Sequence, residues 1–229
     1  MSIEQINEKH PHGGDWLREI VFGLNDGLVT TLVFIMAVSQ VSPGHLLIIV
    51  LGEVLAGAIS MTLGGFLSAR TAQQILDQRI AIERYEVENE PDEERAELRA
   101  IYHKKGFRDP LLRQVIDYLT ANRERWHQAM IHDELGVVEE TEIRPFRQSA
   151  QIGLSFLIGG FIPALPVIFS LPFVQWWAYG LTAVTAMTLG AIKARYTRQG
   201  ALRAGFEFLI IVTIGTFAGV GVGLLLQTR

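Results

Sequence analysis

The stretch LLIIVLGEVLAGAISMTLGGFLS occupies residues 46–68, and it continues without a helix breaker into ARTAQQILDQRIAIERYEVEN, residues 69–89. The first part is mostly apolar, with Glu53 as its one charged residue, and it is long enough to cross a bilayer, which takes about 20 apolar residues in a helix. The second part carries the mixed charges of a helix that faces water. We therefore expect one helix to cross a membrane and to continue into an aqueous compartment.

Four more apolar stretches of similar length accompany this one, and they occupy residues 16–40, 146–169, 174–192 and 204–226. Residues 41–45 and 170–172 are short polar links, which place the helices on either side of them antiparallel to each other. The sequence therefore predicts an all-α membrane protein with five transmembrane helices.

Charge is concentrated in one part of the chain. Between Arg70 and Arg147 lie 17 of the 24 acidic residues and 13 of the 20 basic ones. This segregation predicts three parts: residues 1–69 with spans one and two, residues 70–145 as a polar insert, and residues 146–229 with spans three to five. Helix stop and start signals at Pro91, Gly106, Pro110 and Gly136 divide the insert into three predicted helices.

The positions of Lys and Arg predict the orientation in the membrane, because cytosolic loops are enriched in them. The links between spans one and two and between spans three and four contain none, whereas the link between spans four and five carries four: Lys193, Arg195, Arg198 and Arg203. We expect the N-terminus and the insert to be cytosolic and the C-terminus to lie outside. No cleavable signal peptide is visible, and we expect a cell inner membrane or an organelle membrane.

Carboxylates recur at helical spacing in the insert. Two Glu-x-x-Glu pairs flank the Pro91 turn, and further acids and a thioether end the third predicted helix: Glu83, Glu86, Glu94, Glu97, Met130, Asp133 and Glu134. Oxygen ligands with an occasional thioether suit Fe²⁺, Mn²⁺ or Zn²⁺. The same spacing is equally typical of a solvated helix whose acids pair with Arg84, Arg95 and Arg99. The chain has no cysteine, which excludes disulfides and thiolate sites.

The motif Glu124-x-x-His127 occurs once. Di-iron helical bundles take one such motif from each of two helices. A di-iron oxidase is therefore not expected.

Two carboxylates lie inside predicted spans: Asp26 in the first and Glu53 in the second, with Met61 two helical turns after Glu53 on the same face. Ionisable side chains in a membrane are costly and suggest function by default. Such a pair could exchange protons for a cation. The alternative is a structural role, with hydrogen bonds to Asn25, Ser60 or the backbone.

Three segments resemble the vacuolar iron transporter family, and the resemblance covers nearly the whole chain. They are GLNDGL at residues 23–28, AGAISM at 56–61, and EPDEE through IYHKKG at 90–106. The resemblance implies a homodimer of five-span subunits with a cytosolic three-helix metal-binding domain. It also implies export of Fe²⁺, and often Mn²⁺, from the cytosol in exchange for protons.

Carried over residue by residue, the resemblance implies a transmembrane pathway of Asp26, Glu53 and Met61. It implies a ligand set in the insert made of Glu83, Glu86, Glu94, Glu97, Glu134 and Met130. Two positions depart from the family pattern. Gly65 stands where members carry a Glu, and Ile131 where a second Met is expected.

The expected function is proton-coupled export of a divalent metal, Fe²⁺ or Mn²⁺, bound as substrate, with no prosthetic group and no enzymatic activity. The expected partners are metal ions, protons, membrane lipid and a second copy of the chain. No basic run suggests nucleic acid. The alternative is a membrane-anchored metal-binding or iron-sensing protein that does not transport, in which the insert carboxylates matter and Asp26 and Glu53 do not.

Overall fold

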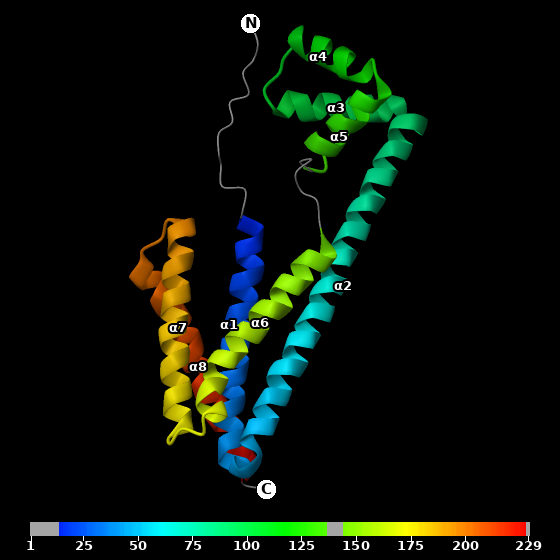
Figure 1. Cartoon of the computed structure of the whole chain (residues 1–229). Coiled ribbons are helices and arrows are strands. Elements are labelled where there is room, and N and C mark those ends of the chain that lie inside the picture. Colours follow the sequence, from blue (N-terminus) through cyan, green and yellow to red (C-terminus); the bar gives the residue numbers. More distant parts are fainter. Residues whose placement is uncertain (1–13, 137–143, 228–229) are drawn as a thin grey trace, which may run out of the picture. The chain divides into compact units, whose positions relative to one another are not determined.

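The computed structural model describes residues 14–136 and 144–227, and its described residues are helical with no strand. The elements in chain order are α1 (Gly14–Val41), the 3₁₀ turn η1 (Pro43–His45), α2 (Leu46–Asn89), α3 (Pro91–Lys104), α4 (Leu111–Thr120), α5 (Arg123–Asp133), α6 (Pro145–Ile168), α7 (Val174–Thr197) and α8 (Ala201–Gln227). Figure 1 shows their course along the chain. The predicted all-α class is confirmed.

The chain divides into two compact units. The bundle unit comprises residues 1–67 and 145–229, and the insert unit comprises residues 68–144. Helix α2 contributes its first half to the bundle unit and its second half to the insert unit, as the unbroken pattern of residues 46–89 predicts.

Within the described residues, four helices are long and apolar enough to cross a membrane: α1, α2, α6 and α8. They correspond to four of the five predicted spans. The fifth, α7, has 24 residues, as many as α6, but it does not meet the same criterion. Its Gln, Tyr, Trp and Thr residues lower its hydropathy, and its last turn carries Arg195.

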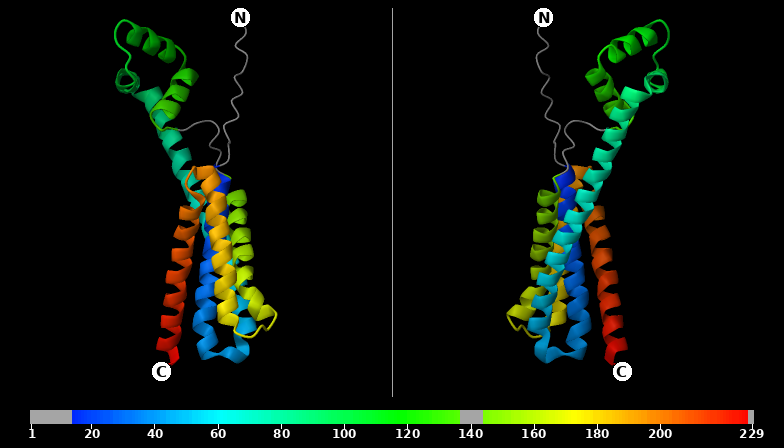
Figure 2. Two further views of the ribbon diagram at one scale, coloured as in Figure 1. Left: turned by 90° about the vertical axis from the view of Figure 1, so that its left-hand side faces the viewer. Right: turned by 90° about the vertical axis from the view of Figure 1, so that its right-hand side faces the viewer.

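Helix α1 lies at the centre of the bundle unit and packs against α6, α7 and α8. The two views of Figure 2 show these helices side by side. Small residues allow the close approach of α1 and α6, because an added Cβ at Gly23 would lie 2.4 Å from the Ile152 carbonyl oxygen. Membrane helices associate through such small-residue contacts, since lipid offers no hydrophobic driving force between them.

Replacement of Gly27 by Ala is expected to destabilise the bundle unit. Its Cβ would lie 2.2 Å from the Phe156 carbonyl oxygen and 2.8 Å from the Gly160 nitrogen, and neither backbone atom can move aside cheaply. We expect a loss of about 1–3 kcal/mol, seen as a lower melting temperature in detergent. Gly221→Ala is the matched control, because nothing lies within 4 Å of its added Cβ. Equal melting temperatures for the two variants would contradict the α1–α6 packing described here.

The insert unit has a core of its own. It is made of six buried side chains, one or two from each helical segment: Val87, Leu98, Leu112, Ile116, Trp126 and Met130. The α3 helix begins with Pro91 at its first turn, followed by three acids, as predicted.

The prediction of a single third helix in the insert is wrong. The chain forms two helices there, α4 and α5, which are separated at Ala121 and Asn122. Asn122 adopts an extended backbone (φ −132°, ψ 125°), and its side chain accepts a hydrogen bond from the Arg125 backbone N–H at 3.0 Å. An asparagine that caps a new helix in this way ends the preceding one. The insert unit therefore contains the end of α2 and three further helices.

Candidate metal centre

Three carboxylates from three helices meet in the insert unit. Glu83 on α2, Glu94 on α3 and Glu134 at the end of α5 each offer an oxygen within 4.8 Å of the others. Glu83 and Glu94 are buried, with 4% and 5% of their surface exposed, whereas Glu134 is exposed. The cluster is therefore an oxygen-rich site with one member open to solvent.

Two of these carboxylates have buried oxygens without a hydrogen-bond partner among the described residues. They are Oε1 of Glu83 and Oε2 of Glu94. An unpartnered buried oxygen of an acid is costly. A bound divalent cation would satisfy both oxygens at once, and oxygen ligands suit hard and borderline metals.

The electrostatics of the cluster favour protons when no metal is bound. Burial, the neighbouring charge of Glu83 and a hydrogen bond with Glu83 raise the pKa of Glu94 to about 8. Burial and repulsion from Glu134 raise the pKa of Glu83. Burial, followed by the charges of Glu97 and Glu86, raises the pKa of Glu134. A cation entering this cluster must therefore displace protons.

Glu86 and Glu97 lie close enough for their charges to act on the cluster, but they are not among the three that converge within 4.8 Å. Glu86 is half-buried and Glu97 is exposed. Met130 is fully buried in the insert core. It lies one helical turn before Glu134, whose backbone N–H donates to the Met130 carbonyl at 2.8 Å.

The nearby arginines have other partners. Arg95 pairs with Asp117, and Arg99 lies 3.2 Å from Asp109. The interpretation of the glutamates as surface partners of these two arginines is therefore wrong. The charges of the glutamates are therefore not neutralised by Arg95 or Arg99.

Asp133 also has partners of its own and does not close the site. It pairs with Lys105 and lies 2.8 Å from His132 Nδ1. Burial opposes its ionisation, but hydrogen bonds with Lys105, His132 and Tyr102 outweigh burial and lower the pKa of Asp133. These contacts hold the end of α5 against α3, next to the position of Glu134.

A second pair of carboxylates lies in the bundle unit. Glu53 accepts a hydrogen bond from Thr31 Oγ1 at 2.9 Å, which joins α2 to α1. Asp26 Oδ1 lies 3.4 Å from Thr30 Oγ1 on its own helix, and its charge acts on Glu53. Both carboxylates are half-buried, as is Met61. No ion pair with Lys or Arg involves Asp26 or Glu53 within the described ranges 14–136 and 144–227.

Sequence reasoning missed the threonines. It proposed Asn25 or Ser60 as the partners of these carboxylates, whereas Thr30 and the fully buried Thr31 fill that role. The spacing of Thr30, four residues after Asp26, was the available signal, since such residues face each other on a helix.

Comparison with known proteins now identifies the family. The sequence model of the VIT family matches residues 17–224. The chain belongs to the VIT family. It is 30% identical over 226 residues to vacuolar iron transporter 1 of Oryza sativa subsp. japonica, covering 97% of this chain and 90% of that protein. It is 31% identical to the vacuolar iron transporter of Acanthamoeba castellanii (93% and 79% covered) and 29% identical to vacuolar iron transporter 1 of Tulipa gesneriana (99% and 93% covered).

Membership of the VIT family confirms the predicted resemblance and the expectation of a transporter in place of an enzyme. Together with the four apolar helices it shows an integral membrane protein. Gly65, which stands where the family pattern has a Glu, is half-buried against α6. An added Cβ there would lie 3.3 Å from Ile152 Cδ1 and 3.5 Å from Ser149.

The raised pKa of Glu94 predicts a pH dependence of the metal-free protein. The folded state holds this proton up to about pH 8, whereas an unfolded Glu loses it near 4.5. The stabilisation is therefore complete below about pH 4.5 and is lost as the pH rises through 8. We expect amide hydrogen exchange in α3 and α5, corrected for intrinsic rates, to be faster at pH 8.5 than at pH 5.5.

Mn²⁺ is expected to restore slow exchange at pH 8.5. Glu94→Gln is expected to remove most of the pH dependence, because the amide does not titrate. Exchange in metal-free wild type that is equal at both pH values would contradict the predicted protonation of the cluster.

Proposed function

We propose that this VIT protein exports Fe²⁺, and with the same oxygen ligands Mn²⁺, from the cytosol in exchange for protons. The observation that carries the proposal is the convergence of Glu83, Glu94 and Glu134, in which Glu83 and Glu94 each have a buried oxygen without a hydrogen-bond partner among the described residues. The chain also holds two carboxylates within membrane helices. The name of the relatives, vacuolar iron transporters, supports iron as the cargo. It also supports a vacuolar or other organelle membrane, with a cell inner membrane as the alternative.

In the proposed topology five helices cross the membrane, including α7. Its 24 residues reach about 36 Å as a helix, which exceeds the hydrocarbon thickness. It packs against α8, α6 and α1 within the bundle unit, so it shares their environment. The basic residues at its last turn and before α8 support a cytosolic N-terminus and insert and an external C-terminus.

The insert unit is proposed to capture metal from the cytosol. Glu83, Glu94 and Glu134 supply three oxygens, while Glu86, Glu97 and Met130 complete the ligand set or attract the ion. Because each protonated carboxyl must lose its proton to bind, capture is weaker at low pH.

The bundle unit is proposed to pass the ion across the membrane through Asp26, Glu53 and Met61. Thr31 orients Glu53 toward α1, where Asp26 is also placed. Two neighbouring carboxylates in an apolar environment bind either one divalent cation or protons. When both are ionised and no cation is bound, their negative charges repel each other. Alternation between these two occupants is the basis of the proposed exchange.

A homodimer is proposed to form along the first half of α2. This segment carries exposed apolar side chains at helical spacing: Ile48 (75%), Leu55 (52%), Ile59 (60%) and Leu63 (65%). Its apolar window is only 17% buried, the same share as in α8, compared with 44% for α1 and 50% for α6. A helix that packs so little within its own subunit is suited to packing against a second copy.

The absence of cysteine from the chain permits a clean test of this dimer. Ile59→Cys in membranes is expected to give a disulfide-linked dimer on mild oxidation, because a two-fold axis along α2 brings the two copies of residue 59 together. Phe217→Cys on α8, which is 74% exposed, is the control and is expected to stay monomeric on denaturing gels. Cross-linking at residue 217 with none at residue 59 would place the dimer elsewhere.

The transport proposal is tested by Fe²⁺ influx into proteoliposomes that contain a metal-quenched dye. Metal influx above that of protein-free liposomes is expected. If the purified chain binds Fe²⁺ but no influx occurs, the protein is a membrane-anchored metal sensor and the transport proposal fails.

A further inference from the structure

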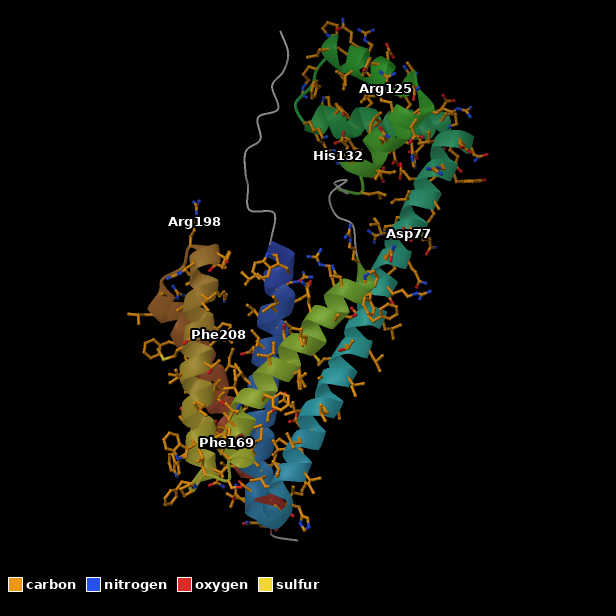
Figure 3. The ribbon with its side chains drawn as sticks, viewed as in Figure 1. Asp77, Arg125, His132, Phe169, Arg198 and Phe208 are labelled. Atoms are coloured by element: carbon orange, nitrogen blue, oxygen red, sulfur yellow. The ribbon has the colours of Figure 1, made fainter. Side chains whose placement is uncertain are left out.

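A cavity of about 460 Å³ lies between α1, α7 and α8 in the bundle unit, and none of the residues proposed to carry metal lines it. Arg18 and Lys193 line one part of it, and apolar side chains such as Phe22, Phe208 and Ile211 line the rest. Figure 3 shows Arg198 at the tip of α7, with Phe208 farther along the bundle. The cavity thus has a basic part and an apolar part within one space.

The basic side chains of the cavity, Arg18 and Lys193, have N–H donors that no acceptor among the described residues uses. Arg18 is 77% exposed and touches only Glu19, at 3.4 Å, among the described residues, which leaves most of its five N–H donors unused. Lys193 lies 3.7 Å from Glu207, which Arg203 also contacts at 3.8 Å. Two cations therefore share one carboxylate at Glu207, so the charge of Lys193 is only partly neutralised.

The apolar part is open to the side. Phe22 is 56% exposed and Ile211 is 45% exposed, so the wall formed by α1 and α8 faces the surroundings of the bundle. In a membrane those surroundings are lipid tails. Next to this wall, the buried Oδ1 of Asn25 has no hydrogen-bond partner among the described residues, and Asn25 lines the cavity.

An aromatic pair marks the membrane interface at this end. Trp16 and Tyr196 contact each other edge to face, with ring centroids 6.2 Å apart, and they are 40% and 57% exposed. Trp and Tyr concentrate at the level of lipid headgroups. Arg18 and Lys193 follow and precede these rings by two and three residues, which places the basic groups at headgroup depth.

We propose that this cavity binds one anionic phospholipid. Its phosphate lies between Arg18 and Lys193, and an acyl chain follows Phe22, Phe208 and Ile211 along α1 and α8. Basic pockets between membrane helices are suited to anionic headgroups. Free phosphate would use the two cations but would leave the apolar wall empty, so the lipid is the favoured source of the phosphate group.

The test is native mass spectrometry of the full-length chain in detergent, titrated with phosphatidylglycerol or phosphatidylcholine of the same acyl chains. We expect one phosphatidylglycerol to be retained in preference to phosphatidylcholine. The double variant Arg18→Gln/Lys193→Gln is expected to weaken phosphatidylglycerol binding about thirty-fold, because each basic residue near a headgroup contributes about five-fold. Lys193→Arg in the wild-type background is expected to preserve binding.

The matched control is Arg195→Gln, which removes an exposed cation of α7 that does not line the cavity, and its binding is expected to equal that of the wild type. Equal retention of the two lipids, or equal losses in the double variant and the control, would overturn the proposal. So would complete displacement of the lipid by millimolar inorganic phosphate, which would identify free phosphate as the ligand. Melting temperatures identify any variant that fails to fold, and the preference of the wild type for phosphatidylglycerol over phosphatidylcholine then carries the comparison. None of these outcomes depends on transport, so the lipid site and the transport proposal fail separately.

Discussion

Replacing Asp26 by Asn is expected to reduce Fe²⁺ flux by about a hundred-fold or more, while metal binding to the insert unit is unchanged. The Asn side chain is nearly isosteric, but it carries no charge for the cation and no carboxyl proton to release. Glu53 alone then faces the ion, with Thr31 as its hydrogen-bond donor. Flux into proteoliposomes measures transport through the bundle unit, and calorimetry measures Mn²⁺ binding to the insert unit.

Asp77→Asn is the matched control for this variant. Asp77 is an exposed acid on α2 that belongs to neither carboxylate group, and Figure 3 labels it. Its flux is expected to equal that of the wild type. Normal flux and normal pH dependence in Asp26→Asn would remove Asp26 from the pathway, and the proton exchange proposed for the bundle unit would fail with it.

Replacing Glu83 and Glu94 together by Gln is expected to weaken Mn²⁺ binding to the insert unit by about a hundred-fold or more. Two of the three converging oxygens lose their charge, and the remaining acid, Glu134, is exposed. Isothermal titration of the full-length chain measures the loss. The unfavourable burial of two carboxyls also disappears, so the variant is expected to fold normally without metal.

Glu88→Gln serves as the control for the cluster, because Glu88 is an exposed acid of α2 close in sequence to Glu83. The double variant is expected to lose flux at low metal concentration and to recover it at saturating metal, since the insert is proposed to capture the ion and not to carry it across the membrane. Wild-type affinity in the double variant would show that the metal binds elsewhere. A loss as large in Glu88→Gln would show an effect of overall charge.

Much of the fold follows from local sequence signals. The uninterrupted residues 46–89 form one helix, and Pro91 ends it and opens the next, because proline at a first helical turn costs no hydrogen bond. The break at Asn122 was missed because asparagine is tolerated within helices, and its capping role depends on the backbone that α4 and α5 adopt when they pack. The polar residues of α7 find partners inside the bundle, as Tyr179 does with Thr213 at 3.2 Å. Hydropathy summed along the sequence does not show such partners.

The candidate metal centre could be predicted only in part from the sequence. Spacing of three residues placed Glu83 with Glu86 and Glu94 with Glu97, but it could not say which member of each pair turns inward. The structure selects Glu83 and Glu94 because their neighbours Val87 and Leu98 lie in the insert core. It also directs Arg95 and Arg99 to Asp117 and Asp109, which are distant in sequence. Contacts between residues that are distant in sequence cannot be predicted from helical periodicity.

The most direct test of the account is Fe²⁺ influx into proteoliposomes under an imposed pH gradient, with dyes for metal and pH enclosed together. We predict that an acidic interior accelerates metal influx, that the interior becomes more alkaline as metal enters, and that both signals disappear in Asp26→Asn. Metal influx that proceeds at one rate whatever the gradient, with no change in internal pH, would contradict exchange of metal for protons and would describe an uncoupled channel.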